Sequence, residues 1–391
     1  MNVLVLSNLY PPNAMGGYEL SCRDVVDRWR ARGHEVTVLT TQGRVAGVVE
    51  PAVEEPHVRR ELEWYWHEHA FLRPALRERL ALERANHRTL AAVLAETCPD
   101  VVSVWHMGGM PLSLLAALGG VPAVLNVCDA WPDYGPRADA WTAGWARWPR
   151  PVRAAASRLT GVPTSLVDLD GFASSFVSGF LLRTLRERTG WRFPGAQVVG
   201  SGIDTADFPV VSSGPDREWR WRLLCVGRVE PRKGFGHAAA ALAELPEATL
   251  RIAGVAEPDH LAQLQALAPG RLSIGAVARA ELRHAYADAD ALLFPSDWEE
   301  PFGLVPLEAM SQGVPVVATR CGGSAEFLVD GVNCLEVPPG DPAAIAAAVR
   351  RLANDPGLRR TLVAGGLSTA RAHTVDGLAD VLEQLHQRAA R

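Results

Sequence analysis

The order of segments at the start of the chain limits the fold more than any other feature. Residues 3–6 form a short apolar run of the β type, and a loop that contains Gly16 and Gly17 follows it. Residues 18–32 have the pattern of a helix, and residues 34–40 (HEVTVLT) have the pattern of a strand. A strand, a glycine loop, a helix and a second strand make the first unit of a doubly wound parallel sheet. The sequence therefore predicts an α/β domain here.

The same order of segments returns in the second half, so we expect two α/β domains. A length of 391 residues also exceeds what one typical core organises. Further strands are predicted at 100–105, 121–128, 222–226, 249–252, 272–274, 291–294 and 314–318, and helices at 73–96, 111–118, 236–245, 279–288 and 342–353. Two glycines in 198–204 (VVGSGID) suit a hinge between the domains. The last helix, predicted at 375–386, fits either domain on its pattern alone.

Composition and charge narrow the class of function. The chain has 39 Lys and Arg against 44 Asp and Glu, and this formal net charge of −5 gives no reason to expect nucleic acid. The first residues, MNVLVLSNLYPP, lack the basic start of a signal peptide, and no apolar stretch reaches the roughly 18 residues that span a bilayer. The six cysteines are widely spaced without a CxxC pair, which favours reduced thiols. We therefore expect a cytoplasmic protein.

Residues 226–236 (VGRVEPRKGFG) predict a site for a diphosphate. Arg228 and Lys233 project from one short turn, where Arg offers a planar fork to phosphate oxygens and Lys a compact charge. The helix that follows Gly234 adds its positive amino end. The alternative is a surface turn with two solvated cations. No GxxxxGK[ST] motif occurs in the chain, so ATP hydrolysis has little support.

Residues 298–310 (WEEPFGLVPLEAM) place two carboxylates, Glu300 and Glu308, around an apolar loop. The first follows the strand predicted at 291–294, at the carboxyl edge of the same sheet as Arg228. Carboxylates are good acceptors for vicinal hydroxyls. We therefore expect these two to hold two sets of hydroxyls, one on a sugar ring and one on a ribose.

The loop between the two carboxylates is expected to present its backbone to the ligand. Pro306 suits the first turn of a helix, where the N–H groups have no partners within the helix. The N–H groups that would point towards the ligand are those near Phe302, Gly303 and Leu304.

With these motifs in place, the chain resembles a family 4 retaining glycosyltransferase of the GT-B fold. The matching residues are GGYE at 16–19, GRVEPRKG at 227–234, EPFGLVPLE at 300–308, GVPVVAT at 313–319 and GG at 322–323. The match covers the first forty residues and nearly all of the second half, whereas residues 44–200 carry less of it. The resemblance implies two Rossmann-like doubly wound domains that face each other across a cleft. It places the acceptor in residues 1–198, joined by a closing helix at about 373–391, and the nucleotide-sugar donor in residues 199–372.

The resemblance also implies a role for each matching residue. The enzyme would be of the hexosyltransferase type and take an NDP-sugar, such as a UDP-sugar or GDP-sugar. Arg228 and Lys233 would contact the diphosphate, and Glu308 the ribose. Glu300, with the Phe302-Gly303 backbone, would contact the donor sugar. Gly16 and Gly17 would close over the phosphates from the opposite domain.

The candidates on the acceptor side come from the first half. His106 ends a strand in VVSVWHMGG, so we expect it at the carboxyl edge near the reacting sugar, with a structural role as the alternative. Asp129 follows the next strand, in NVCDAWPDYG. Relatives often have His-Asp at this point, whereas Cys128 precedes the aspartate here, which puts any role of position 128 in doubt. The acceptor-side candidates are Glu19, Asp129, Trp131 and Tyr134.

Three patterns that resemble metal sites are predicted to hold no metal. Asp168-Leu169-Asp170 and Asp288-Ala289-Asp290 formally match the DxD motif, but both lie outside the predicted site and suit helix caps or solvated positions. His67-Glu68-His69 has three adjacent residues that do not share a face. Two cations and a helix end can neutralise a leaving diphosphate without a divalent ion. We therefore expect neither a metal nor another cofactor.

Residues 141–158 are unusually rich in Trp and Arg, and no acidic residue occurs between Asp139 and Asp168. Such a segment can pack between helices, form a flap over an acceptor, or lie on an anionic membrane surface. Pro149 and Pro151 are expected to break the helix that a membrane contact would prefer.

The sequence thus predicts a metal-independent retaining glycosyltransferase, either cytoplasmic or peripheral at the inner membrane face. Its hydroxyl acceptor would belong to a cell-envelope glycan or glycolipid, or to a secondary metabolite. No residue stands out as a covalent nucleophile, so a front-face route is favoured over double displacement. The alternatives are a sugar phosphorylase or sucrose-phosphate-type synthase of the same fold, and an inactive nucleotide-sugar-binding module. The base, the sugar, the linkage and the oligomeric state leave no mark in the sequence.

Overall fold

A computed structural model of the protein describes residues 1–45, 55–67, 70–212 and 218–391. These residues form two compact units, the first with Met1–Val199 and Leu378–Arg391 and the second with Gly200–Gly377. Each unit has its own sheet and its own buried apolar core. The predicted division lay at 198/199, with residues from about 373 assigned to the first domain. No helix within the described ranges has both the length and the apolar character to cross a bilayer.

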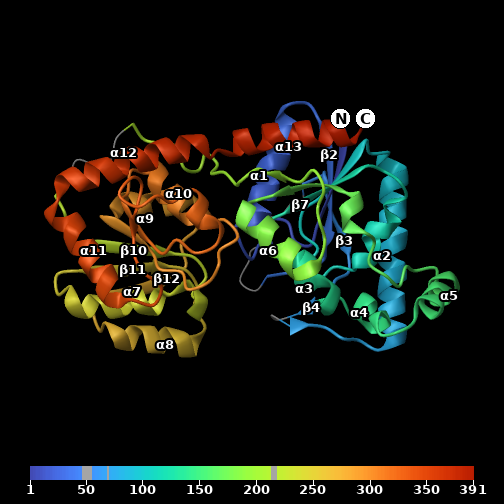
Figure 1. The fold of residues 1–391 in the computed structure, drawn as a ribbon, viewed down its shortest axis with the longest axis horizontal. Helices are drawn as coiled ribbons and strands as arrows, with labels where there is room; N and C mark the ends of the chain where they lie inside the picture. The colour runs from blue at the N-terminus through green and yellow to red at the C-terminus, as the bar shows by residue number, and fades with distance from the viewer. Residues whose placement is uncertain (46–54, 68–69, 213–217) are drawn as a thin grey trace. The chain divides into compact units, whose positions relative to one another are not determined.

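The first unit is built on a seven-stranded sheet in the order β3-β2-β1-β6-β7-β8-β9 (Figure 1). All neighbouring strands pair in parallel. A parallel sheet is covered on both faces, which explains why its central strands are continuous apolar runs. The strands are β1 (Asn2–Ser7), β2 (Glu35–Thr41), β3 (Val58–Leu62), β6 (Val101–Val104), β7 (Ala123–Val127), β8 (Ala173–Phe176) and β9 (Gln197–Val198). A separate antiparallel pair is formed by β4 (Trp66–His67) and β5 (Ala70–Phe71).

Helices of the first unit connect these strands and include the C-terminal one. They are α1 (Gly17–Ala31), α2 (Leu76–Thr97), α3 (Trp131–Ala138), α4 (Ala140–Ala146), α5 (Arg150–Thr160), α6 (Gly179–Thr189) and α13 (Val375–Ala389). The α13 helix is tied to α1, because the Trp29 indole N–H donates to the carbonyl of Ala379 at 3.2 Å. Arg32 adds ion pairs to Asp380 and Glu383. Two 3-10 segments lie at Leu112–Leu118 and Leu169–Gly171.

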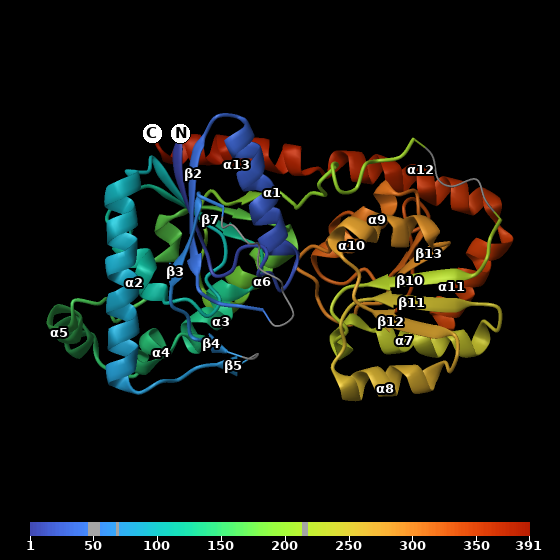
Figure 2. The ribbon, with the colours of Figure 1, turned by 180° about the vertical axis from the view of Figure 1, so that it is seen from behind.

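The second unit has a six-stranded parallel sheet in the order β12-β11-β10-β13-β14-β15. Figure 2 shows α7 and α8 on one face of this sheet and α9 and α10 on the other. The strands are β10 (Arg222–Val226), β11 (Thr249–Ala253), β12 (Leu272–Gly275), β13 (Ala291–Phe294), β14 (Val316–Ala318) and β15 (Leu335–Glu336). The helices are α7 (Phe235–Ala241), α8 (Pro258–Leu267), α9 (Arg279–Asp288), α10 (Leu304–Ser311), α11 (Pro342–Asn354) and α12 (Pro356–Ala372).

Of two local expectations, one was wrong and one was confirmed. The segment predicted as a helix at 111–118 is a 3-10 segment, Leu112–Leu118. The expected break at Pro149 and Pro151 is confirmed: α4 ends at Ala146, and α5 begins at Arg150 with Pro149 as its N-cap and Pro151 in its first turn. Proline is tolerated there because the first N–H groups of a helix have no internal partner.

A buried polar cluster links α2 to the loop before β4 and to the 3-10 segment at Leu112–Leu118. The Glu83 carboxylate accepts hydrogen bonds from the Tyr65 hydroxyl at 2.8 Å and from the Ser113 hydroxyl. His87 in turn lies 2.8 Å from the Ser113 oxygen. Burial of the carboxyl group, helped by the charge of Asp139, raises the pKa of Glu83 from 4.5 to about 8.

This raised pKa predicts that the protein loses stability as the pH rises from about 5 to 8. The unfolded chain releases the Glu83 proton near 4.5, whereas the folded chain keeps it until about 8. The folded state therefore binds more protons in this window, and the free energy of unfolding falls with rising pH. We expect a Glu83→Gln variant, which stays neutral, to lack this loss of a few kcal/mol. Urea unfolding of both proteins at the two pH values measures it, and parallel pH profiles would contradict the assignment.

Candidate active site

The turn after β10 brings together the two cations that the sequence assigns to a diphosphate. Arg228 follows Gly227 directly after the strand, and Lys233 ends a 3-10 turn at Pro231–Lys233. The Arg228 guanidinium pairs with the Glu230 carboxylate at 2.7 Å, and about half of its side chain is exposed. Glu230 also pairs with Arg232 at 2.5 Å, whose guanidinium stacks on Trp298. One carboxylate thus holds two arginines of the turn.

The second cation meets the first of the two predicted carboxylates. Lys233 Nζ lies 2.6 Å from Glu300 Oε1, and the Ser296 hydroxyl donates to the same oxygen at 3.2 Å. The Glu300 side chain is 8% exposed, so its charge is compensated mainly by this lysine. Lys233 and Glu300 come from the carboxyl ends of two neighbouring strands, β10 and β13. The parallel sheet therefore places a cation and a carboxylate in contact at the edge where ligands of this fold class bind.

A glycine pair fixes the backbone of Glu300. Residues 300 and 322 form an isolated parallel bridge, and the Gly323 N–H donates to the Glu300 carbonyl at 2.6 Å. Gly322 has a φ of +68°, and a Cβ atom there would lie 2.5 Å from the Glu300 carbonyl oxygen. Only glycine fits such an approach. The motif at 322–323 thus supports the carboxylate through the backbone.

The second carboxylate, Glu308, lies on α10 and is nearly buried. Its Oε2 accepts a hydrogen bond of 2.6 Å from the hydroxyl of Tyr286, a fully buried residue of α9. Burial, together with the charge of Glu308, raises the pKa of Tyr286 well above its ordinary value, so the phenol stays a donor. Tyr286 therefore orients the carboxylate that the sequence assigns to a ribose.

Phe302, Gly303 and Leu304 lie between the two carboxylates at the start of α10. Gly303 is the N-cap residue with a φ of +97°, and Leu304 is the first helical residue. The Phe302 ring is buried, with the rings of Phe327 and His373 at centroid distances of 5.1 and 5.9 Å. Its side chain anchors the loop, so any contact with a ligand would come from its backbone.

In the first unit, His106, Asp129 and Tyr134 form one hydrogen-bonded cluster. His106 follows β6, and its Nε2 lies 2.9 Å from Asp129 Oδ2. The Tyr134 hydroxyl donates to the same oxygen at 2.8 Å. Burial alone would raise the pKa of Asp129, but the imidazole and the two hydrogen bonds outweigh it and lower that pKa. The carboxylate is therefore charged, and it holds the imidazole in place.

The orientation of the His106 ring follows from its two nitrogens. Nδ1 accepts a hydrogen bond of 3.2 Å from the Gly108 N–H, so the Nε2 side carries the proton that faces Asp129. The Tyr18 ring stacks on the imidazole at 4.3 Å with an interplanar angle of 18°. Gly108 leaves room for both side chains, because a Cβ atom there would lie 2.4 Å from the Tyr134 oxygen and 2.5 Å from the His106 ring. The imidazole thus acts as a fixed donor in this arrangement.

The glycine loop before α1 is held by Glu19. Its two carboxylate oxygens accept from the N–H groups of Met15 and Gly16 at 3.0 and 2.9 Å. Gly16 is the N-cap residue of α1, and Gly17 is its first helical residue. Glu19 has no exposed surface, and burial raises its pKa. We expected Glu19 on the acceptor side, but its position identifies it as a support of the glycine loop.

Trp131 is also placed differently from the expectation of an acceptor contact. Its side chain is fully buried and belongs to the core of the first unit. Of the four acceptor-side candidates, Asp129 and Tyr134 remain beside His106.

Three of the aspartates in the DxD matches have structural roles. Asp168 caps a 3-10 turn, and Asp170 accepts from the N–H groups of Arg192 and Phe193. Asp290 accepts from the N–H groups of Arg220 and Arg222. Of the third pattern, Glu68 and His69 lie outside the described residues. Among the described residues, no group of three His, Cys, Asp or Glu side chains is close enough to hold an ion.

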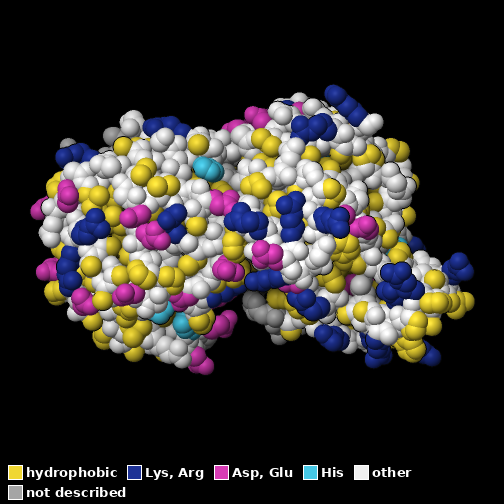
Figure 3. Space-filling view, in the orientation of Figure 1, with side chains coloured by type: hydrophobic (Ala, Val, Ile, Leu, Met, Phe, Trp, Pro, Cys, Tyr) yellow, Lys and Arg dark blue, Asp and Glu magenta, His cyan; other side chains and the backbone are white. Residues whose placement is uncertain are grey.

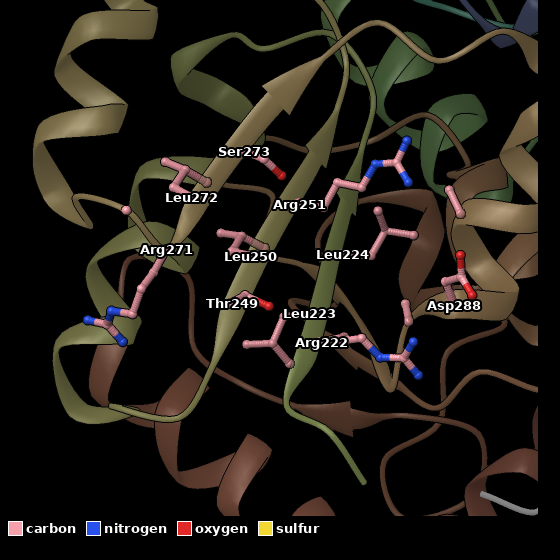
Figure 4. A pocket seen from close by; sticks show the side chains of 13 residues that line it. Arg222, Leu223, Leu224, Thr249, Leu250, Arg251, Arg271, Leu272, Ser273 and Asp288 are labelled. Carbon is pink, nitrogen blue, oxygen red and sulfur yellow. The ribbon is translucent and has the colours of Figure 1, made fainter. Parts of the chain in front are cut away.

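A hollow of about 380 Å³ lies elsewhere on the second unit (Figure 4). Its lining comes from the neighbouring strands β10, β11 and β12 and from the end of α9. The charged residues of this lining are Arg222, Arg251, Arg271 and Asp288. None of the residues predicted to bind a donor lines it.

Four residues that support the site were not found by sequence reasoning: Tyr18, Glu230, Tyr286 and Ser296. Tyr18 belongs to the GGYE motif and Glu230 to the GRVEPRKG motif, so the signal was present. Tyr286 is 22 positions from Glu308 on another helix, and no local pattern links the two residues.

Comparison with known proteins agrees with this geometry. The family described as "Glycosyl transferases group 1" matches residues 220–355, and the "Glycosyl transferase 4-like domain" matches residues 16–170. The glycogen synthase of Mycobacterium tuberculosis is 30% identical over 387 residues, which cover 91% of this chain and 87% of that protein. The chain therefore belongs to the group 1 glycosyltransferases, of the family 4-like type, and is a glycosyltransferase.

Solved structures show the same fold. Sucrose-phosphate synthase from Thermosynechococcus elongatus superposes with a TM-score of 0.73 at 20% identity, covering 99% of this chain and 98% of that one. HepE of Anabaena, solved in complex with UDP and glucose, gives 0.66 at 19% identity and covers 98% of both chains. The two Rossmann-like units thus form a GT-B fold.

Proposed function

We propose that the protein is a retaining, metal-independent glycosyltransferase that moves a sugar from a nucleoside diphosphate sugar to a hydroxyl acceptor. The observation that carries the proposal is the contact between Lys233 and Glu300 beside Arg228 at the carboxyl edge of the second sheet. A diphosphate needs the cations, and a sugar hydroxyl needs the carboxylate. HepE, a structural relative, has been solved with UDP and UDP-glucose, which supports a donor of this class.

In the proposed arrangement, the second unit holds the donor. Arg228 and Lys233 bind the diphosphate, Glu300 binds the transferred sugar, and Glu308, oriented by Tyr286, binds the ribose. The N–H groups at the start of α10 add donors. The resemblance assigns Gly16 and Gly17 to the phosphates as well.

The first unit supplies the acceptor side. The bond between the anomeric carbon and the phosphate oxygen breaks, and the acceptor oxygen attacks the same face of the sugar. The departing phosphate oxygen takes the acceptor's proton, and its negative charge is stabilised by the two cations. His106, which Asp129 and Tyr134 hold in place, assists through its position beside the acceptor, because its Nε2–H already donates to Asp129. The acceptor is a hydroxyl on a cell-envelope glycan or glycolipid, or on a secondary metabolite.

Calorimetric titration with a panel of nucleotide sugars, followed by product analysis, tests the proposal. We expect one UDP-sugar or GDP-sugar to bind and to yield a glycoside with the anomeric configuration of the donor. Release of a sugar phosphate in the presence of inorganic phosphate would identify a phosphorylase instead. Binding without any product across an acceptor panel would identify a nucleotide-sugar-binding module. An inverted product would exclude the retaining route.

Activity should survive removal of divalent ions. Arg228 and Lys233 carry the positive charge that a metal would otherwise supply to the diphosphate, so we expect EDTA to leave the rate unchanged. The measurement is the initial rate in EDTA, against a control with EDTA that is saturated with Mg²⁺. A rate that vanishes in EDTA and returns with Mg²⁺ or Mn²⁺ would refute this prediction.

A further inference from the structure

The Trp- and Arg-rich segment at 141–158 divides into a packed part and an exposed part. Trp141 is buried, stacks edge-on against Trp145 and donates its indole N–H to the Pro163 carbonyl. The chain beyond Trp145 is exposed up to the start of α5. Packing therefore accounts for the first two tryptophans but not for the residues that follow them.

Helix α5 carries an apolar stripe that none of the described elements covers. Val152 and Leu159 are seven positions apart, two turns along the same face, and Ala155 lies between them. Leu159 is 83% exposed, Val152 41%, and Trp148, just before the helix, 45%. The face next to this stripe holds the helix to the first unit, because Ala156, one turn after Val152, is buried and the Thr160 carbonyl accepts from Arg84 of α2.

Arginines border this stripe. Residues 140–167 contain Arg147, Arg150, Arg153 and Arg158 and no acidic residue, so the segment carries four positive charges. Arg147, Arg150 and Arg158 are exposed, and no carboxylate of a described residue forms an ion pair with them. We call Arg147, Trp148, Arg150, Val152, Arg158 and Leu159 the α5 patch. Figure 3 shows apolar and basic side chains side by side over α5.

Apolar exposure extends from the patch to the start of α2. Leu72 and Leu76 are 41% and 55% exposed, and Arg73 and Arg77 beside them are exposed as well. Arg79, in the first turn of α2, donates to the carbonyl of Ala140, which ties this segment to α4. Both segments thus expose apolar side chains with arginines beside them.

We propose that the α5 patch docks the protein on an anionic lipid surface. The patch stands out as a helix rather than forming a groove, so it suits a fluid planar partner better than a protruding peptide. Trp and Leu can enter the headgroup region while the flanking arginines remain at the lipid phosphates. The proposal rests on the first unit alone and does not depend on the donor site.

Flotation of the full-length protein with lipid vesicles tests the proposal. We expect binding to vesicles in which one third of the phosphatidylcholine is replaced by phosphatidylglycerol, and little binding to pure phosphatidylcholine. Binding should weaken as salt is added, because exposed charges are screened. Each arginine near an anionic surface contributes roughly a fivefold factor, so Arg147→Glu, Arg150→Glu and Arg158→Glu together should lower binding about a hundredfold or more.

Two further variants distinguish binding through the α5 patch from binding through the overall charge of the protein. Val152→Ser with Leu159→Ser removes the apolar stripe without changing charge and should lower binding by about tenfold. Arg283→Glu, Arg351→Glu and Arg360→Glu change the charge of the second unit by the same amount and should bind vesicles almost as well as the native protein. All three proteins should keep the native thermal midpoint, since the substituted side chains are exposed.

The opposite results would overturn the proposal. Native protein that ignores anionic vesicles refutes it directly, as does an equal loss in both triple variants. Capture on heparin without vesicle binding would assign the patch to a soluble polyanion instead.

Discussion

Replacing Lys233 by Ala should lower kcat/KM for the donor about a hundredfold or more. One charge-assisted contact to the leaving diphosphate is worth about 1.5–3 kcal/mol. The lysine also compensates the nearly buried carboxylate of Glu300, at 2.6 Å, so its removal disturbs the group proposed to hold the sugar. Arg228→Ala loses only the first of these effects, and we expect a tenfold to hundredfold loss. Steady-state kinetics with the cognate donor measures both.

The same turn offers a matched control. Arg232 lies one residue before Lys233, but its guanidinium stacks on Trp298 and pairs with Glu230. Arg232→Ala removes an equal charge from the same turn and should change kcat/KM by less than about fivefold, as for an exposed ion pair. Near-normal kinetics in both Lys233→Ala and Arg228→Ala would end the diphosphate assignment, and so would an equal loss in Arg232→Ala.

The two carboxylates of the 300–308 segment should respond differently to two ligands. Glu308→Gln is expected to weaken free nucleoside diphosphate and intact donor alike, because both contain the ribose. Glu300→Gln should leave nucleoside diphosphate affinity nearly unchanged and reduce donor binding and turnover, because only the donor contains the sugar. Each loss should be about 1.5–3 kcal/mol in the complex that contains the hydroxyl. Calorimetric titration of each variant with each ligand gives the four affinities.

Tyr286→Phe is the control for the ribose half of this prediction. It removes the donor to Glu308 without removing the carboxylate, so it should weaken both ligands in the pattern of Glu308→Gln, with a smaller effect. Equal losses for both ligands in Glu300→Gln would show that the two rings have been assigned to the wrong carboxylates.

Much of the fold could be predicted because apolar strands and glycine turns have recognisable local sequence patterns. The strands at 222–226 and 291–294 and the helix at 279–288 have the bounds that the sequence indicates. The edge strand β3 (VRREL) was not predicted because its charged residues interrupt the apolar pattern of a strand. β15 was not predicted because it has only two residues. Short edge strands depend on their neighbours in the sheet rather than on their own apolar pattern.

The site was less accessible to sequence reasoning, because its supporting contacts join distant positions. The motifs identified Lys233 and Glu300, but their ion pair spans 67 positions and only the sheet brings them together. Tyr18 and His106 stack across 88 positions. Glu19 was expected on the acceptor side. The local sequence does not distinguish a carboxylate that faces a ligand from one that accepts hydrogen bonds from the backbone, as Glu19 does.

The contact of Lys233 with Glu300 also bears on how the enzyme would finish a turnover. With the donor bound, the diphosphate competes for the lysine while the sugar hydroxyls occupy the carboxylate. After transfer the sugar would leave with the acceptor, and Glu300 would keep Lys233 and Ser296 as its side-chain partners among the described residues. The carboxylate then competes with the spent nucleotide for the same ammonium group. If the proposed assignments hold, Glu300 would act as a tethered counter-ion that speeds product release and limits inhibition by the leaving nucleotide.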